Sequence, residues 1–437
     1  MSIATIILAA GQGTRMRSNL PKVLHPLAGA PLVIHSLQSA AHLGAAKTIV
    51  VTGHGADAVT DVTKSYDPTC ECVLQSKQLG TGHAVDQARD ILAGFPGHVL
   101  VLYGDTPLIR PETLKNLLAK LDQAAVAVLG FQTDNPGRYG RLVMRGDQLD
   151  KIIEFKDATT QEQKITLCNS GVMAAPAALL FELLSGLNND NASGEYYLTD
   201  VVGAARARGL TCAAVVCDVT ETLGVNSRVE LAQAEAVFQA RARHSALENG
   251  VTLQAPETVY FAHDTVIGRD TVIEPHVVFG PGVQVQGGAH IRAFSHLEGC
   301  DVATGVCVGP YARLRPGTIL EDKARIGNFV ELKAARVGSG AKINHLTYIG
   351  DADIGARSNI GAGTVTCNYD GMSKHKTTIG QEAFIGSDTM LVAPVTVGDQ
   401  AMTASGSVIT RDVPAGDLAL GRAVQVNKPG LARKFIK

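Results

Sequence analysis

The sequence predicts an α/β domain with a mostly parallel sheet, followed by a linker helix and a parallel β-helix. Three observations lead to this fold class. Apolar runs of strand length alternate with helical patterns over residues 1–226. A single helical pattern covers residues 227–249. Over residues 250–437 an aliphatic or small residue returns about every six positions, a period that fits neither a helix nor a hairpin meander.

Five apolar runs in the first part have the length of buried strands. They cover residues 3–9, 47–51, 99–103, 125–131 and 213–216. Because helical patterns separate these runs, we expect parallel strands with helices on both faces of the sheet. Such sheets bind ligands beyond the C-terminal ends of their strands, so the residues that follow each run are candidate site residues.

The segment 227–249 reads as one helix between the two parts. Val229, Ala232, Ala236 and Ala240 recur at helical spacing, which predicts that they form its apolar side. Asn249-Gly250 is a typical helix end. The predicted boundaries are therefore 1–226, 227–249 and 250–437.

The six-residue period marks one inward position on each face of a triangular solenoid. Each coil buries little surface alone, so stacked coils must share one core. The marked residues are Ile267, Ile273, Phe279, Val285, Ile291, Leu297, Val302, Val308, Leu314, Leu320, Ile326, Leu332, Val337, Ile343, Ile349, Ile354, Ile360, Thr366, Ile379, Ile385, Leu391, Val397, Thr403 and Ile409.

Composition limits the classes of partner. With 39 basic and 41 acidic side chains the net charge is −2, so we expect no nucleic-acid surface and no polybasic membrane anchor. The first apolar run is short and lacks preceding basic residues, which suits a strand better than a signal peptide, and no run is long enough to span a bilayer. Eight cysteines without a repeating spacing indicate reduced thiols and a cytoplasmic location.

A glycine-rich segment, Gly11-Gln12-Gly13-Thr14-Arg15, follows the first strand and precedes Lys22. Its glycines let backbone N–H groups approach a polyphosphate, and Arg15 and Lys22 supply positive charge. The segment resembles the signature of the sugar-phosphate nucleotidyltransferases, which implies a Rossmann-like nucleotidyltransferase domain and catalytic roles for Arg15 and Lys22. The alternative is an ordinary tight turn. The implied nucleotide contacts are Leu8, Ala9, Ala10, Gly11, Gly13 and Lys22.

A second segment, residues 75–84, resembles the base-recognition loop of that family. The resemblance implies that Gln75 and the backbone of Gly80 read the uracil edge with help from Thr81. An amide suits this task because it both donates and accepts hydrogen bonds. The alternative is a helix N-terminus capped by Thr81.

The strand 99–103 ends in Tyr103-Gly104-Asp105, which places a carboxylate at the ligand-binding edge of the sheet. Asn226 matches the family's second metal ligand. We therefore expect Asp105 and Asn226 to bind Mg²⁺, with Tyr103 and Gly104 beside the nucleotide. In the family, positions matching Gly140, Glu154 and Asn169 hold the sugar of a UDP-N-acetylhexosamine.

The β-helix carries its own candidate site. Residues 368–377 interrupt the six-residue count, and insertions in solenoids form binding loops. His345 lies off the inward position, and Arg313, Arg315 and Lys333 are near it in the sequence. These segments resemble the family of bifunctional bacterial N-acetylglucosamine-1-phosphate uridyltransferases / glucosamine-1-phosphate N-acetyltransferases, and the resemblance extends over residues 3–429.

This resemblance implies a left-handed β-helix and a homotrimer with acetyl-CoA bound between neighbouring solenoids. His345 would be the general base, since a histidine of pKa about 6.5 can accept the proton of glucosamine's ammonium group. Glu331 would orient either His345 or the amine. Sugar-phosphate binding is implied for Arg315, Lys333, Tyr348 and Asn359, and acetyl-CoA binding for Ala362, Asn368, Tyr369, Ser387, Ser405 and Arg422.

The implied substrates are glucosamine 1-phosphate, acetyl-CoA, N-acetylglucosamine 1-phosphate and UTP. Their product, UDP-N-acetylglucosamine, feeds peptidoglycan and, in some bacteria, lipopolysaccharide. One departure from the family lies in the C-terminal tail, which often carries an aromatic and a basic cluster over the CoA site. This chain has no tryptophan and ends with residues 430–437, Gly-Leu-Ala-Arg-Lys-Phe-Ile-Lys.

Two other functions remain open. A sugar-nucleotide pyrophosphorylase could carry a purely structural β-helix, although such a solenoid has no use for His345 or the 368–377 insertion. A non-catalytic scaffold, like the guanine-exchange subunits of translation initiation, shares the two-domain layout. The intact Gly11, Gly13, Lys22 and Asp105 disfavour it.

Overall fold

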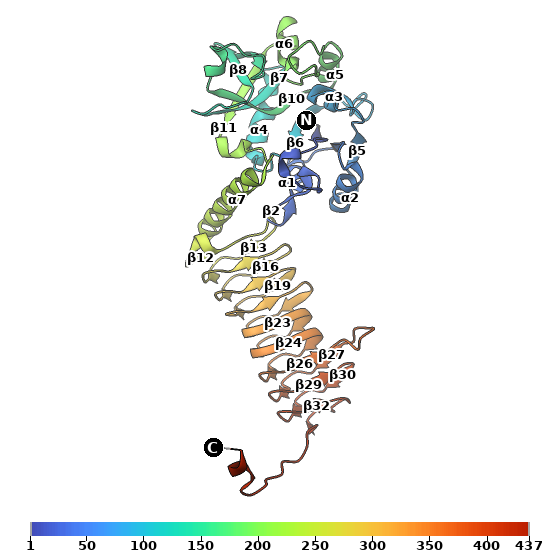
Figure 1. Ribbon diagram of the computed structural model, residues 1–437, viewed down its shortest axis with the longest axis vertical. Coiled ribbons are helices and arrows are strands. Elements are labelled where there is room, and N and C mark those ends of the chain that lie inside the picture. Colours follow the sequence, from blue (N-terminus) through green and yellow to red (C-terminus); the bar gives the residue numbers. More distant parts are fainter. Residues whose placement is uncertain (1, 436–437) are drawn as a thin grey trace. The chain divides into compact units, whose positions relative to one another are not determined.

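The computed structural model describes residues 2–435. The chain divides into two compact units, Met1–Phe238 and Gln239–Lys437, and the division falls within helix α7 (Arg228–Glu248) (Figure 1). The structure confirms the predicted architecture, because the first unit is an α/β domain and the second a parallel β-helix.

The central sheet of the first unit has the strand order β11-β7-β10-β6-β1-β4-β5. The five predicted strands are present and agree with their predicted ends to within one residue. They are β1 (Ile3–Ala9), β4 (Lys47–Thr52), β6 (His98–Tyr103), β7 (Val126–Gln132) and β11 (Cys212–Cys217). Pairs β1–β4, β1–β6, β4–β5 and β11–β7 are parallel.

Four strands were not anticipated from the sequence. β5 (Glu71–Leu74) forms one edge of the sheet, and β10 (Leu167–Pro176) lies antiparallel between β6 and β7. A hairpin of β8 (Arg141–Arg145) and β9 (Gln148–Ile153) extends from β10. These additions surround the sugar-binding residues expected from the resemblance.

Helices cover both faces of this sheet because side chains alternate sides along each strand. Ile6 and Val101 pack into one apolar cluster with Leu180 of α5, whereas Ile7 and Leu102 pack into another with residues of α1 and α4. The helices are α1 (Leu32–His42), α2 (Ala56–Tyr66), α3 (Thr81–Asp86), α4 (Pro111–Ala119), α5 (Ala177–Ser185) and α6 (Asp200–Ala207).

Helix α7 exists where it was predicted, but the predicted apolar side is wrong. Val229, Ala232, Ala236 and Ala240 are exposed, and the side that packs on the domain instead contains buried Ala234 with partly buried neighbours. Alanine and valine occur on all sides of this helix, so the larger side chains decide which side is buried. The partly buried neighbours are Leu231, Val237 and Phe238.

The second unit is a β-helix in which each strand pairs in parallel with strands of the coils before and after it, as Figure 1 shows from β13 (Val266–Ile267) to β32 (Val408–Ile409). The predicted inward residues are buried, except Ile267, which is partly buried in the first coil. The corners lie three residues later and adopt positive φ, for example 63° at Asp270, 59° at His276 and 74° at Gly282. Left-handed corner residues turn the chain between faces, which explains the six-residue period.

The C-terminal tail contains only a short 3₁₀ helix (Leu431–Lys434), which is exposed. Ile436 and Lys437, which belong to the atypical tail, lie outside the described residues. Within residues 2–435, no helix is both long and apolar enough to traverse a membrane. All eight cysteines have free thiols.

Candidate active sites

A cavity of about 320 Å³ lies beyond the C-terminal ends of β1 and β6. This position follows from the parallel sheet, in which neighbouring strands end at one edge. The cavity brings together most of the expected nucleotide contacts, and Gln78 and Glu195 also line it. Those contacts are Leu8, Ala9, Ala10, Gly11, Lys22, Gln75, Gly80, Thr81, Tyr103 and Asp105.

The glycine-rich loop packs tightly against Lys22. Gly13 has φ of 63°, and a Cβ atom there would lie 2.5 Å from the Cβ atom of Lys22. Only glycine fits this position, which explains the second glycine of the motif. Arg15 lies in a 3₁₀ turn (Thr14–Met16) and is exposed.

Lys22 connects the two expected metal ligands. Its Nζ atom donates to the carboxylate of Asp105 and lies 3.0 Å from Oδ1 of Asn226. The backbone also joins these segments, because the N–H of Val225 donates to the Asp105 carbonyl at 2.8 Å. The ammonium group of Lys22 is therefore shared by a carboxylate oxygen and an amide oxygen. Mg²⁺ prefers oxygen ligands of these two types.

No group of three or more histidine, cysteine, aspartate or glutamate side chains within residues 2–435 could hold a metal ion. With one carboxylate and one amide oxygen, the Asp105–Asn226 pair fits a divalent ion that takes its other ligands from phosphate oxygens and water. Nucleotidyl transfer in this domain uses a divalent metal of that kind.

The base-recognition loop begins directly after β5. Gln75 is only 4% exposed, and Gly80 precedes α3 as its N-cap without any side-chain cap. The alternative reading, in which Thr81 caps the helix, is wrong. The Oγ1 atom of Thr81 instead accepts a hydrogen bond from the N–H of Leu198 at 3.0 Å.

The expected sugar-binding residues converge. The N–H of Asn169 donates to the Gly140 carbonyl at 2.8 Å, and a Cβ atom at Gly140 would lie 3.5 Å from both Asn169 Cβ and Glu154 Oε1. Thr199 donates to Glu154 at 3.2 Å. Burial raises the pKa of Glu154, and it also raises the pKa of nearby Tyr103. A further cavity of about 550 Å³ is lined by Arg138, Glu154, Phe155, Lys156, Gln163, Ser193, Glu195 and Tyr197.

Arg141, which follows Gly140 in the chain, supports this region from behind. Its side chain is fully buried, and the guanidinium donates only to backbone carbonyls among its described partners. The acceptors are Gly137 at 3.0 Å, Pro136 at 3.4 Å, Gln163 at 3.1 Å and Tyr139. These bonds hold the loop before Gly140 against the segment before β10.

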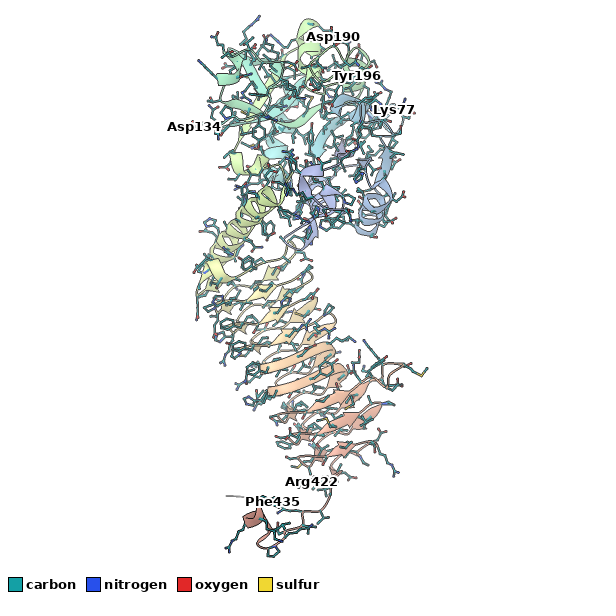
Figure 2. All side chains as sticks on the ribbon, in the orientation of Figure 1. Lys77, Asp134, Asp190, Tyr196, Arg422 and Phe435 are labelled. Atoms are coloured by element: carbon teal, nitrogen blue, oxygen red, sulfur yellow. The ribbon has the colours of Figure 1, made fainter. Side chains whose placement is uncertain are left out.

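In the β-helix, residues implied to bind acetyl-CoA lie along one corner in successive coils. The N–H of Gly363 donates to the Leu346 carbonyl at 3.1 Å, that of Asp388 to Ala362 at 2.7 Å, and that of Gly406 to Ser387 at 2.8 Å. The corner therefore carries His345, Ala362, Ser387 and Ser405 in order. Arg422 follows them at the end of the solenoid, where its guanidinium donates to the Ser405 carbonyl at 2.9 Å (Figure 2).

His345 is oriented by a residue that the sequence did not indicate. Its Nδ1 atom lies 2.7 Å from Oδ1 of Asn328, which is its direct register partner in the preceding coil. Glu331 was expected to orient either His345 or the amine, and among the described residues its side-chain contacts are with arginines and not with His345. Glu331 instead accepts a hydrogen bond from Arg315 at 2.9 Å and lies 3.9 Å from the guanidinium of Arg313.

A cluster of charged and polar residues lies beside that corner. Lys333 lies 3.1 Å from Asp351, which also accepts from Asn368. Contact with Lys333 lowers the pKa of Lys374. Two neighbouring ammonium groups suit a phosphate. Lys374 belongs to the 368–377 insertion, whereas Asp351 carried no sequence signal.

Tyr348 and Asn368 meet above Gly350. A Cβ atom at Gly350 would lie 2.5 Å from the Tyr348 hydroxyl and 2.7 Å from Nδ2 of Asn368. Asn359 is paired in register with Lys342. Tyr369 is exposed in the insertion, and its hydroxyl donates to the Gly371 carbonyl at 2.7 Å.

Comparison with known proteins supports both halves of this description. Residues 5–177 match the model of the MobA-like NTP transferase domain. The chain is 63% identical over 436 residues to the bifunctional protein GlmU of Roseobacter denitrificans, covering 100% of this chain and 97% of that protein. It is 62% identical over 437 residues to the protein of the same name from Ruegeria pomeroyi, with coverage of 100% and 97%. The corresponding values for Jannaschia sp. are 61% over 433 residues, 99% and 95%. The chain therefore belongs to the family of bifunctional GlmU proteins and is a bifunctional transferase of UDP-N-acetylglucosamine synthesis.

Proposed function

We propose that each unit catalyses one of two consecutive reactions. The β-helix would transfer an acetyl group from acetyl-CoA to glucosamine 1-phosphate, and the α/β domain would then transfer a uridylyl group from UTP to N-acetylglucosamine 1-phosphate. The observation that carries this proposal is that one chain contains two separate sites. One is built around Lys22, Asp105 and Asn226, and the other around His345 and Lys333.

In the α/β domain, the sugar-phosphate oxygen would attack the α-phosphorus of UTP, and pyrophosphate would leave. The nucleophile is already anionic, so the protein needs no general base and acts by positioning and charge. Asp105 and Asn226 would hold Mg²⁺, which neutralises the developing phosphate charge. Lys22 and Arg15 would bind the phosphates, while Glu154, Asn169 and Gly140 hold the N-acetylated sugar.

In the β-helix, the ammonium group of glucosamine 1-phosphate must lose a proton before its nitrogen attacks the thioester carbon. His345 would accept this proton at Nε2, because Asn328 accepts from the opposite ring nitrogen, Nδ1. The C–S bond then breaks, and coenzyme A leaves as the thiol. Arg315 and Lys333 would bind the sugar phosphate, and Tyr348 and Asn359 the sugar. Acetyl-CoA would lie along the corner formed by Ala362, Ser387 and Ser405, with Asn368, Tyr369 and Arg422 beside it.

We also propose that the protein is a homotrimer, which an exposed edge of the solenoid supports. His276, Phe294, Tyr311 and Phe329 occupy one corner in successive coils, with ring centroids 4.9, 4.9 and 5.2 Å apart. We call these four stacked rings the aromatic ladder. Its members Phe294, Tyr311 and Phe329 are between 48% and 55% exposed. Such a contiguous apolar edge favours burial against another chain. Tyr311 and Phe329 also line a cavity that contains Tyr348, so a neighbouring copy would complete the acetyl-transfer site. Free cysteines support a cytoplasmic location.

The decisive experiment supplies purified protein with glucosamine 1-phosphate, acetyl-CoA, UTP and Mg²⁺, and follows free thiol and pyrophosphate separately. Release of both supports the two reactions. His345→Ala should stop thiol release, and pyrophosphate release by this variant should then require added N-acetylglucosamine 1-phosphate. Pyrophosphate release only after addition of N-acetylglucosamine 1-phosphate, without any thiol, would indicate a uridyltransferase with a structural β-helix. The absence of both products would favour a scaffold.

A further inference from the structure

His83 lies behind the base-recognition loop and has no role in the reaction described so far. It belongs to α3, is half-buried and does not line the nucleotide cavity. Its partner Gln75 is buried and does line that cavity. The amide nitrogen of Gln75, Nε2, lies 3.0 Å from Nδ1 of His83 and 3.1 Å from the carbonyl oxygen of Gly80.

These two contacts determine which end of the Gln75 amide faces the cavity. The Gly80 carbonyl can only accept, and it already accepts from the N–H of Ala84 at 3.1 Å. The nitrogen of the Gln75 amide must therefore face Gly80 and His83, and its two protons are used there. The oxygen Oε1 is the group that remains available to a base, and it can only accept a hydrogen bond.

An acceptor at this position distinguishes the two pyrimidines. Uracil carries a proton on N3 and can donate it to Oε1, whereas N3 of cytosine is an acceptor and would face Oε1 with lone pair against lone pair. A wrong ligand is rejected strongly when its binding leaves a buried polar group of the site unpaired or facing a group of the same kind. The direction of the Gln75 amide therefore sets the preference for UTP over CTP.

We propose that His83 is a specificity-determining positioning residue. Its unprotonated Nδ1 holds the Gln75 amide with the oxygen towards the base. This inference rests on the proposed binding of UTP in this cavity and adds the group that controls nucleotide choice. His83 never touches the nucleotide.

The surrounding contacts hold the backbone that carries His83. Gln87 donates to the His83 carbonyl at 3.0 Å, and the N–H of Gly82 donates to the Tyr196 carbonyl at 2.8 Å. The second contact fastens the start of α3 to the segment before α6. The amide nitrogen of Gln87 also lies 3.4 Å from Nε2 of the His83 ring. The fold thus positions His83 independently of any ligand, as expected of a preorganised specificity device.

The test compares kcat/KM for UTP and for CTP, each with N-acetylglucosamine 1-phosphate, by pyrophosphate release from the full-length protein. His83→Leu removes the acceptor and should lower the UTP/CTP ratio about tenfold, the change expected for one hydrogen bond. His83→Gln keeps a side-chain oxygen and should retain most of the ratio. His42→Leu is the matched control, because His42 is exposed on α1 and bonds only to Gln38 among its described partners.

The thermal unfolding of the α/β domain, followed by circular dichroism, reports whether each variant is folded, because acetyl transfer belongs to the other unit. A ratio that is unchanged in His83→Leu, with both kcat/KM values lowered equally, would show that His83 merely supports the loop and would overturn the inference. A wild-type protein that releases pyrophosphate from neither nucleotide would instead contradict the proposed uridylyl transfer. The two failures are therefore distinguishable.

Discussion

The Nδ1 atom of His345 lies 2.7 Å from Oδ1 of Asn328, which belongs to the preceding coil of the β-helix. This hydrogen bond places the proton of a neutral imidazole on Nδ1 and leaves Nε2 free to act as a base. Asn328→Ala should therefore lower the rate of thiol release roughly tenfold without changing pyrophosphate release.

A carboxylate at the same position gives a sharper test. In Asn328→Asp the new negative charge stabilises the imidazolium form, so the pKa of His345 rises and the acidic limb of the kcat/KM profile for acetyl transfer moves to higher pH. An unchanged profile in Asn328→Asp would show that Asn328 does not contact the catalytic ring. The profile for uridylyl transfer is the internal control.

Metal removal should separate the two activities. Asp105 and Asn226 converge on Lys22 in the α/β domain, whereas the acetyl-transfer chemistry needs only a base and a thioester. Chelation with EDTA should abolish pyrophosphate release and leave thiol release intact. Asp105→Asn should lower pyrophosphate release by at least about 100-fold and raise the Mg²⁺ concentration needed for half activity.

Asp134→Asn provides the control for this substitution, since Asp134 is exposed on the same domain (Figure 2). Equal sensitivity of thiol release to EDTA would contradict the assignment of the metal to the uridylyl site alone.

Glu154 should make the stability of the α/β domain depend on pH. Burial raises the pKa of Glu154 above its ordinary value of 4.5, so folding favours the protonated form. The ionised carboxylate therefore lowers the free energy of unfolding. This destabilisation is complete at pH values above the pKa of Glu154 in the folded protein, and it is absent at pH values below the pKa in the unfolded chain. Glu154→Gln should unfold at a higher temperature than the wild type at about pH 8, with the difference vanishing as the pH falls towards the unfolded pKa.

The same variant should raise KM for N-acetylglucosamine 1-phosphate roughly tenfold, because an amide is a weaker acceptor than a carboxylate. Glu182→Gln is the control, since Glu182 is exposed and pairs with Arg208. A stability difference that does not vary with pH would refute the buried-carboxylate explanation.

Arg141 should affect the binding of the sugar phosphate and not the binding of the nucleotide. In Arg141→Met the carbonyls of Pro136, Gly137, Tyr139 and Gln163 lose their donors, which should cost about 3 kcal/mol of stability in this unit. The loop before Gly140 would then be less ordered, so KM for N-acetylglucosamine 1-phosphate should rise about tenfold while KM for UTP stays unchanged.

Arg145→Met, on the exposed part of β8, is the matched control. Kinetic measurements at fixed UTP and at fixed sugar phosphate separate the two KM values. A parallel rise in both would mean that Arg141 supports the whole domain and not the sugar loop.

The aromatic ladder should be required for assembly and for acetyl transfer. Phe329→Glu places a charge at the end of the ladder that is nearest the acetyl-transfer site, so light scattering should report dissociation of the trimer, and thiol release should fall with it. Pyrophosphate release should continue. Val266→Glu on the face that carries Gln284 and Asp301 is the control, because Val266 is exposed there without an aromatic neighbour in register. A trimer that survives Phe329→Glu would move the interface elsewhere.

The sequence by itself determined the architecture, because hydrophobic periodicity directly reports burial. Period six marked the inward residues of the β-helix, and strand-length apolar runs marked five strands of the sheet. The glycine motif, Gln75 and Asp105 could also be located, since each follows a predicted strand. Strand β10 was missed because Asn169, Ser170 and Gly171 interrupt its apolar residues, and the hairpin β8–β9 was missed because its two strands are short and carry many polar residues.

Only the tertiary structure decided which side chains meet. The exposed side of α7 was mistaken for its buried side, since small apolar residues occur all around that helix. The partners of Asn328, Lys374, Asp351 and Arg141 could not be predicted, because another coil or loop supplies them. The same holds for His83, whose Nδ1 faces Gln75 only after β5 and α3 are fixed by the sheet. Local sequence encodes burial and chain direction, whereas the direction of a hydrogen bond depends on atoms that folding brings together.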